Sequence, residues 1–375
     1  MGYSINEAKE LVIRAGKMLV ESGLIARTWG NISARISDTQ FVITPSGLAY
    51  ETLTPEQIVI VNIADCSYEG QIKPSSEKGI HADAYRLRSD VNFIIHTHQL
   101  KASVISIDGT NLMVRQDEYK KILGEIIPCA AYGMPSTGKL RKAVAQSVSD
   151  YPKSKAVLMK CHGTVCMGTS LENSFEIART LETIAEEKYQ EVCGKSKPAA
   201  SNIPDYGSSE RNGDCFILNC NNQSTEYKIS NLSESAPKVA ILHAAIYKNS
   251  KVNHIIHTTE EDVVEASRTG QILRPYLDDL AQIAGINIKT VRKGLTNTAT
   301  VVKELHKKNA VLLENAGALC TGITKDDAIA VGMVLKKGCV AHLYSIAIHN
   351  TKWLSNLDAT LQRIIYVKKY SKQKK

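Results

Sequence analysis

Three histidines and one glutamate are the residues of this chain whose types and spacing best fit metal chemistry. His96 and His98 stand two positions apart in the segment VNFIIHTH, at the end of an apolar run. Positions i and i+2 of a strand share one face, so both imidazoles leave the same side. His162 follows a second apolar run, and Glu77 stands at the head of a helical pattern. This set of nitrogen and oxygen donors predicts a catalytic divalent-metal site with a position left for substrate.

The elements that must position these side chains follow from the spacing of apolar residues. Helical spacing predicts helices over 5–23, from Glu77 onward, over 140–148 and over 171–192. Apolar runs before His96 and His162 predict the two strands that present these histidines. The segments TWGNISARI and FVITPSGLAY predict two further strands joined by a short turn.

The order of these motifs closely resembles the class II aldolase/adducin family and is L-fuculose-phosphate aldolase-like. The motifs are PSSE at 74–77, HTH at 96–98, CHG at 161–163, TWGN at 28–31, ITPSG at 43–47 and IPCAAY at 127–132. The resemblance covers residues 7–190. It implies an α/β fold of three layers, in which helices flank a mostly antiparallel central sheet.

The family's site roles transfer to matching residues of this chain. The resemblance implies that His96, His98, His162 and Glu77 hold a divalent metal, Zn²⁺ in the first place with Mn²⁺ or Co²⁺ as alternatives. It implies that Glu77 also acts as acid and base. Tyr132 matches a tyrosine that protonates or orients the aldehyde oxygen from a neighbouring subunit.

The resemblance also implies a phosphate site formed by two loops and a helix start. We assign Asn31, Ser46, Gly47, Ser75 and Ser76 to it. Amide, hydroxyl and backbone N–H donors at a helix N-terminus suit a phosphate. The sequence PSSE is equally an ordinary capped helix start, and the two interpretations are compatible.

The second half of the chain repeats the first in eroded form. The segment LHAAIYKNSKVNHIIHTT from Leu242 parallels IHADAYRLRSDVNFIIHTH from Ile80, and a segment from Lys308 parallels one from Lys155. The copy keeps His243 and His257 opposite His81 and His96. It replaces the other site residues: Val239 stands opposite Glu77, Thr259 opposite His98, Ala316 opposite His162 and Lys293 opposite Tyr132.

This loss predicts a second domain without a metal. Because His81 and His243 persist in both copies, we expect them to be packing residues. We predict a metal-binding domain at 1–195, a linker at 196–226 that is rich in Pro, Ser, Gly and Asn, a degenerate domain at 227–352, and a basic tail at 353–375. Two such chains are expected to form a homodimer that mimics the family's tetramer.

Composition is that of an ordinary globular protein, with 43% hydrophobic and 22% charged residues and a net charge of +8. The amino-terminal segment lacks the features of a signal peptide, and no apolar run approaches the roughly 18 residues of a membrane span. We therefore expect a cytoplasmic protein whose partner is a small sugar phosphate, without membrane or specific nucleic-acid binding.

The motifs favour one reaction among several. The family's aldolases carry glutamate at the position of Glu77, whereas its pentulose-phosphate 4-epimerases carry aspartate. We predict cleavage of a ketose 1-phosphate, or of a related sugar phosphate, to dihydroxyacetone phosphate and an aldehyde. A sugar-phosphate dehydratase shares the metal triad and stays open as an alternative. The non-enzyme alternative is an adducin-like interaction module, whose heads lack the complete ligand set.

Overall fold

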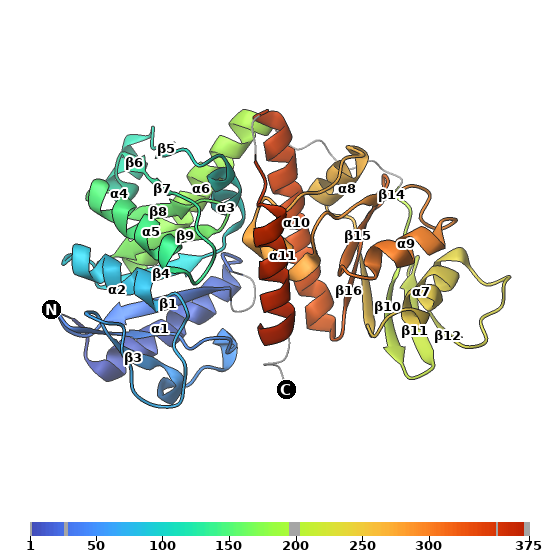
Figure 1. Cartoon of the computed structure of the whole chain (residues 1–375), viewed down its shortest axis with the longest axis horizontal. Coiled ribbons are helices and arrows are strands. Elements are labelled where there is room, and N and C mark those ends of the chain that lie inside the picture. The colour runs from blue at the N-terminus through green and yellow to red at the C-terminus, as the bar shows by residue number, and fades with distance from the viewer. Residues whose placement is uncertain (1, 26–28, 195–202, 350–351, 371–375) are drawn as a thin grey trace. The chain divides into compact units, whose positions relative to one another are not determined.

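The chain divides into two compact units, Met1–Val192 and Cys193–Lys375. The computed structural model describes residues 2–25, 29–194, 203–349 and 352–370. Each unit contains a seven-stranded sheet with helices packed against it (Figure 1). The predicted α/β fold, with two tandem copies, is confirmed.

The first sheet has the order β3-β2-β1-β4-β9-β8-β7. All its neighbouring strands run antiparallel except β7 and β8, which are parallel. A separate pair, β5 (Leu112–Met113) and β6 (Ile126–Ile127), lies outside it. The strands of the seven-stranded sheet are β1 (Gly30–Arg35), β2 (Gln40–Ile43), β3 (Val59–Asn62), β4 (Phe93–Thr97), β7 (Cys129–Ala130), β8 (Ala156–Met159) and β9 (Gly163–Gly168).

Helices α2 and α5 pack on one face of this sheet, where Ile80, Tyr85, Leu140 and Val144 join the buried side chains of the strands. Burial of this apolar surface is the main stabilising term of the unit. The expected helices at 5–23, 140–148 and 171–192 are all present. The helices are α1 (Ile5–Glu21), α2 (Lys78–Leu87), α3 (Leu100–Ile105), α4 (Asp117–Leu123), α5 (Gly138–Asp150) and α6 (Leu171–Cys193).

The second sheet repeats this arrangement in the order β12-β11-β10-β13-β16-β15-β14. Its strands are β10 (Ser208–Asn212), β11 (Cys215–Cys220), β12 (Gln223–Lys228), β13 (His254–Thr258), β14 (Thr290–Val291), β15 (Ala310–Leu313) and β16 (Gly317–Gly322). Its helices are α7 (Lys238–Lys248), α8 (Glu261–Arg268), α9 (Thr298–Leu305), α10 (Lys325–Ala347) and α11 (Asn356–Ile365).

The predicted linker at 196–226 is wrong over most of its length. Residues 196–202 lie outside the described residues, but 208–228 form β10, β11 and β12, which stand where β1, β2 and β3 stand in the first sheet. The strand β12 lies at the sheet edge and most of its residues are exposed. Both of its faces meet water, so its sequence lacks the apolar alternation by which a half-buried strand is recognised.

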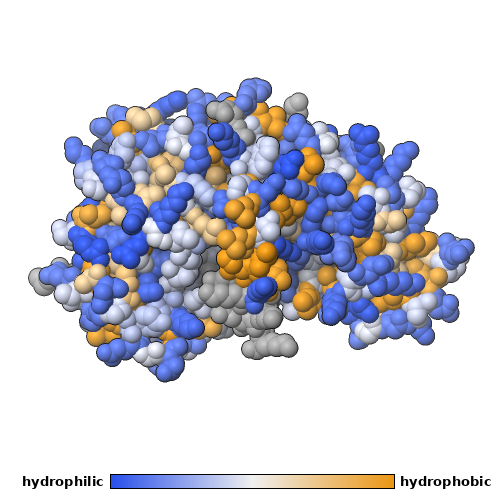
Figure 2. Space-filling model, viewed as in Figure 1, coloured by the Kyte–Doolittle hydropathy of each residue, from blue (hydrophilic) through white to orange (hydrophobic). Residues whose placement is uncertain are grey.

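The predicted basic tail at 353–375 is wrong in its first half. Residues of α11 pack against the π-helical turn η4 (Leu280–Ala284). Gln362 Nε2 donates to Asp278 Oδ1 at 2.5 Å, and Arg363 donates to the carbonyl oxygens of Gln282 and Ile283 at 2.7 Å. These bonds tie α11 to the second unit. The outer face of α11 stays apolar, and hydrophobic surface lies over this helix in Figure 2.

Helix α10 alone, among the described residues, has the length and apolar composition of a membrane span. Within its most apolar window, however, 67% is buried inside the protein. It contacts β16, α8 and η4. Its apolar character is therefore that of a helix in the core of the second unit.

Candidate metal centre

The structure brings Glu77, His96, His98 and His162 together at one point. The ligand atoms of the three imidazoles lie within 4.8 Å of one another. His96 Nε2 lies 3.2 Å from His98 Nε2 and 3.2 Å from Glu77 Oε2. His162 Nε2 lies 3.3 Å from Glu77 Oε1. Glu77, His96 and His162 are buried, and His98 is partly exposed.

These separations fit a tetrahedral ion. Zinc binds imidazole nitrogen at about 2.0–2.1 Å, which places neighbouring tetrahedral donors about 3.3 Å apart. The measured separations of 3.2–3.3 Å match that spacing. Buried donors gathered around one point are costly unless a cation compensates them. The residues present therefore fit a divalent metal.

The ligands come from three elements that meet at one end of the sheet. His96 lies on β4, and His98 follows the end of that strand. Glu77 is the N-cap residue of α2, which packs on the sheet face that carries Ile94 and hence His96. His162 lies in the turn between β8 and β9, where Cys161 adopts a left-handed backbone with φ of 62°.

Backbone contacts fix the orientation of the His96 ring. Its Nδ1 lies 2.7 Å from the carbonyl oxygen of Thr164 and donates to it, so the lone pair of Nε2 is left facing the other ligands. A hydrogen bond from the ring nitrogen that does not face the metal selects the tautomer of a metal-binding histidine. Gly163 lets the rings approach, because a Cβ there would lie 3.1 Å from His96 Cε1 and 2.4 Å from the Thr97 oxygen.

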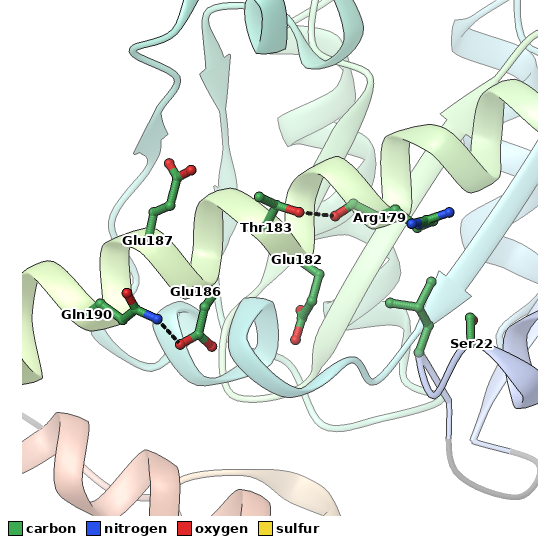
Figure 3. Close-up of a pocket in the computed structure, with 8 residues that line it drawn as sticks. Ser22, Arg179, Glu182, Thr183, Glu186, Glu187 and Gln190 are labelled. Atoms are coloured by element: carbon green, nitrogen blue, oxygen red, sulfur yellow. Dashed lines mark hydrogen bonds between the residues drawn. The ribbon is translucent and has the colours of Figure 1, made fainter. Parts of the chain in front are cut away.

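Helix α6 anchors the segment that follows His98. The Glu182 carboxylate accepts from the backbone N–H groups of Lys101 at 2.6 Å and Ala102 at 3.0 Å, in the first turn of α3. Gln99 Nε2 donates to the carbonyl oxygen of Ala178 at 3.0 Å. Figure 3 shows Glu182 on α6, where it lines an open groove of about 670 Å³. None of the four candidate ligands lines that groove.

Glu77 is ionised despite its burial. Burial by itself raises the pKa of a carboxyl, but His162 and His96 act against it and hold the pKa of Glu77 well below its usual range. Asn31, predicted to bind phosphate, is also buried and donates from Nδ2 to Glu77 Oε2 at 3.3 Å. Sequence reasoning missed this contact, since nothing in a linear pattern joins residues 46 positions apart.

The other predicted phosphate residues lie on two loops that are bonded to each other. The Ser46 N–H donates to the Lys73 carbonyl at 2.9 Å, and the Ser75 N–H donates to the Thr44 carbonyl at 3.0 Å. Gly47 is exposed with φ of 79°, and Ser76 is exposed. The Ser75 hydroxyl accepts from the Glu77 N–H at 3.3 Å. The N-cap residue of α2 is Glu77 and makes no side-chain cap bond, so the predicted serine cap is wrong, and the phosphate role of this loop stays a prediction.

Tyr132 stands just after the end of β7, which pairs in parallel with β8, the strand that leads into His162. It is half-buried and follows β7, which is separated from β9 by β8. Its role stays a prediction that depends on a neighbouring subunit.

The second copy has a different arrangement at the equivalent point. His257 Nε2 lies 2.7 Å from the Ala316 carbonyl oxygen and donates to it. Its Nδ1 accepts from the Tyr206 N–H at 3.2 Å and lies 3.4 Å from Asp205. Both ring nitrogens are therefore engaged by protein atoms. Thr259 and Ala316 replace the other two histidines.

The fold and the site define a class of protein, and comparison with known families agrees. The family model described as "Class II Aldolase and Adducin N-terminal domain" matches residues 10–189 and 211–343. The chain belongs to this family and contains two copies of its domain. The second match begins at residue 211, inside β10, in agreement with the observed strands.

Characterised relatives are sugar-phosphate aldolases. The chain is 33% identical over 187 residues to a 5-deoxy-D-ribulose 1-phosphate aldolase of Bacillus thuringiensis, with 50% of this chain and 86% of that protein covered. It is 31% identical to an L-fuculose phosphate aldolase of Escherichia coli, with 48% and 82% covered. A solved L-fuculose 1-phosphate aldolase aligns with a TM-score of 0.45 at 30% identity, with 48% and 84% covered.

Proposed function

We propose that this protein is a divalent-metal-dependent aldolase that cleaves a ketose 1-phosphate, or a related sugar phosphate, to dihydroxyacetone phosphate and an aldehyde. The observation that carries the proposal is the buried cluster of His96, His98, His162 and Glu77 at tetrahedral spacing. The relatives named above are aldolases of deoxyribulose and fuculose phosphates, and they are about a third identical to this chain over the half of it that aligns.

His96, His98 and His162 would hold the metal, with Glu77 as the fourth ligand before substrate arrives. Zinc is the ion whose ligand preferences best fit this donor set. When bound, the ion supplies Lewis-acid stabilisation of the negative charge that develops as the carbon–carbon bond breaks.

The protein's own groups handle the protons and the phosphate. Glu77 would return a proton to the carbon that carries the negative charge after cleavage, and would remove that proton in the synthetic direction. The loops of Ser46–Gly47 and Ser75–Ser76 would bind the phosphate, since both carry serine hydroxyls and are held to each other by backbone bonds before the start of α2. Tyr132 would take up the proton of the hydroxyl that becomes the aldehyde oxygen in cleavage, and would protonate that oxygen in the synthetic direction.

The assembly and the compartment belong to the same proposal. A homodimer would supply the four domains of a tetramer, with a neighbouring domain at each site. The protein would act in the cytoplasm, in line with the ordinary globular composition of its sequence.

A coupled enzyme assay tests the function. Purified protein is analysed for metal and then assayed for dihydroxyacetone phosphate released from L-fuculose 1-phosphate, 5-deoxyribulose 1-phosphate and 5-methylthioribulose 1-phosphate. The expected result is release that a chelator stops and zinc or manganese restores. Bound metal without release from any of these would contradict the aldolase assignment and favour the epimerase or dehydratase. Protein without metal would favour the interaction module.

A further inference from the structure

A chain of hydrogen bonds runs through the core from α2 to Glu77. Tyr85 Oη lies 2.8 Å from Ser33 Oγ, which lies 2.6 Å from His81 Nδ1. His81 Nε2 lies 2.5 Å from Asn31 Oδ1, and Asn31 Nδ2 lies 3.3 Å from Glu77 Oε2. His81, Ser33 and Tyr85 are between 0% and 2% exposed, so water does not compete for these bonds.

The chemistry of the five groups fixes the direction of every bond. The Glu77 carboxylate can only accept, so Asn31 must present its NH₂ there and its oxygen to His81. His81 Nε2 must then carry a proton. Burial lowers the pKa of His81 to about 3, so the ring is neutral and its Nδ1 accepts from the Ser33 hydroxyl. Ser33 in turn accepts from Tyr85, whose pKa is raised by burial.

The second copy contains the same hydrogen-bonded serine, histidine and tyrosine but lacks the glutamate. Ser209 Oγ lies 2.6 Å from His243 Nδ1 and 2.7 Å from Tyr247 Oη. His243 is also 0% exposed. Its Nε2, however, donates to the backbone carbonyl of Tyr206 at 2.8 Å. Packing alone therefore retains the serine, histidine and tyrosine, and the first copy differs in directing Nε2 at a side chain that contacts Glu77.

We propose that His81 is a positioning residue for the metal centre: it fixes the Asn31 amide so that its NH₂ group faces Glu77 and holds that carboxylate toward the histidines. A flipped amide would place its oxygen against the carboxylate and repel it. The second N–H of Asn31 remains for a phosphate oxygen. This inference rests on the proposed function, in which Glu77 is a metal ligand.

Two variants of His81 separate the positioning role from packing. In His81→Gln the amide nitrogen can reach the place of Nε2 and donate to Asn31. In His81→Asn the shorter side chain reaches Ser33 only. Zinc affinity is measured on the full chain by competition with a chromophoric chelator, without substrate. We expect His81→Asn to weaken zinc binding by about 10- to 100-fold, the usual effect of losing an outer-shell partner, and His81→Gln to recover most of it.

His243→Asn is the matched control, because it has the same burial and the same serine and tyrosine neighbours. We expect both asparagine variants to lower the melting temperature, but His243→Asn to leave zinc affinity within about twofold of the unmodified chain. In an Asn31→Ala background, His81→Asn should add little further loss of zinc affinity. Equal zinc affinities for His81→Asn and His243→Asn, or failure of His81→Gln to recover, would overturn the proposal.

A measurement on the unmodified protein tests the proposed role of His81 even if His81→Asn does not fold. Long-range ¹H–¹⁵N correlation spectra report which ring nitrogen carries the proton. We expect a neutral His81 with its proton on Nε2 at pH 7, and a proton on Nδ1 would refute the assignment. The zinc and NMR measurements need no aldolase activity, so they stand apart from a failure of the cleavage assay.

Discussion

Gly163 decides at the scale of one residue how closely the metal ligands can approach. A Cβ at this position would lie 2.4 Å from the Thr97 carbonyl oxygen and 3.3 Å from His98 Cδ2. The strand β4 would have to move to admit it, and the imidazoles would move with the strand.

Gly163→Ala should therefore lower zinc content and cleavage activity while the protein stays folded. The matched control is Gly317→Ala in the second copy, where a Cβ would lie 2.1 Å from the Thr258 oxygen. That variant should cost stability without changing zinc content. Metal analysis and thermal unfolding of both variants test this, and a Gly163→Ala protein with full zinc content would disprove it.

Buried neutral histidines make the second unit sensitive to acid. Burial lowers the pKa of His243 to about 4 and that of His342 to about 4, from an ordinary 6.5. Above pH 6.5 these histidines are neutral in both the folded and the unfolded chain, so they do not change the free energy of unfolding. As the pH falls below 6.5, the unfolded chain takes up protons that the folded unit does not, so the free energy of unfolding decreases down to about pH 4.

His243→Gln should weaken that dependence. Each buried histidine contributes a loss of about 2 kcal/mol between pH 7 and pH 5. The variant should have a lower free energy of unfolding than the unmodified protein at pH 7, but this free energy should decrease less between pH 7 and pH 5. Urea unfolding followed at both pH values measures this. If the free energy of unfolding fell equally with pH in the two proteins, His243 would not contribute to the acid sensitivity.

At the scale of elements, α6 holds the start of α3 and with it the segment after His98. Glu182 accepts from two backbone N–H groups that a helix start otherwise leaves without partners. A carboxylate also interacts favourably with the positive end of a helix. The short helix α3 and the strand end at His98 are thus fixed by one side chain of α6.

Glu182→Ala should reduce the free energy of unfolding by about 1–3 kcal/mol and weaken zinc binding, because His98 gains freedom. Glu182→Gln keeps one acceptor, so its stability and zinc affinity should lie between those of Glu182→Ala and the unmodified protein. Glu187→Ala is the control on the same helix, since Glu187 is exposed and bonds only to Gln116 among the contacts of the described chain. Chemical unfolding and zinc titration compare the three, and equal effects of the two alanine variants would contradict this account.

At the scale of the whole molecule, two copies of one fold hold one complete ligand set. We expect about one zinc per 375-residue chain. His98→Ala should abolish tight binding, while His257→Ala should leave the stoichiometry unchanged because both nitrogens of His257 already bond to protein atoms. Metal analysis of the three proteins tests this, and two tightly held ions per chain would be incompatible with it.

The duplication could be predicted because burial preserves sequence patterns even when chemistry is lost. The apolar strands before His96 and His257, and the apolar strands β8 and β15, keep their residue types since both cores require them. The strands β10–β12 could not be predicted in this way. Most side chains of β10 and β12 are polar and at least partly exposed, and β11 buries only Phe216 and Leu218, so little in their sequence distinguishes a sheet edge from a linker.

The tandem repeat and the candidate ligands could be predicted from residue type and spacing in the sequence, and the α/β class from its resemblance to a known family. Three features became visible only in the folded chain: Asn31 bonds to Glu77, the Nε2 atoms of His81 and His243 have different partners, and α11 belongs to the second unit. These are contacts between residues far apart in the chain. Hydrogen-bond direction and close packing arise only when folding brings such groups together and excludes water from them.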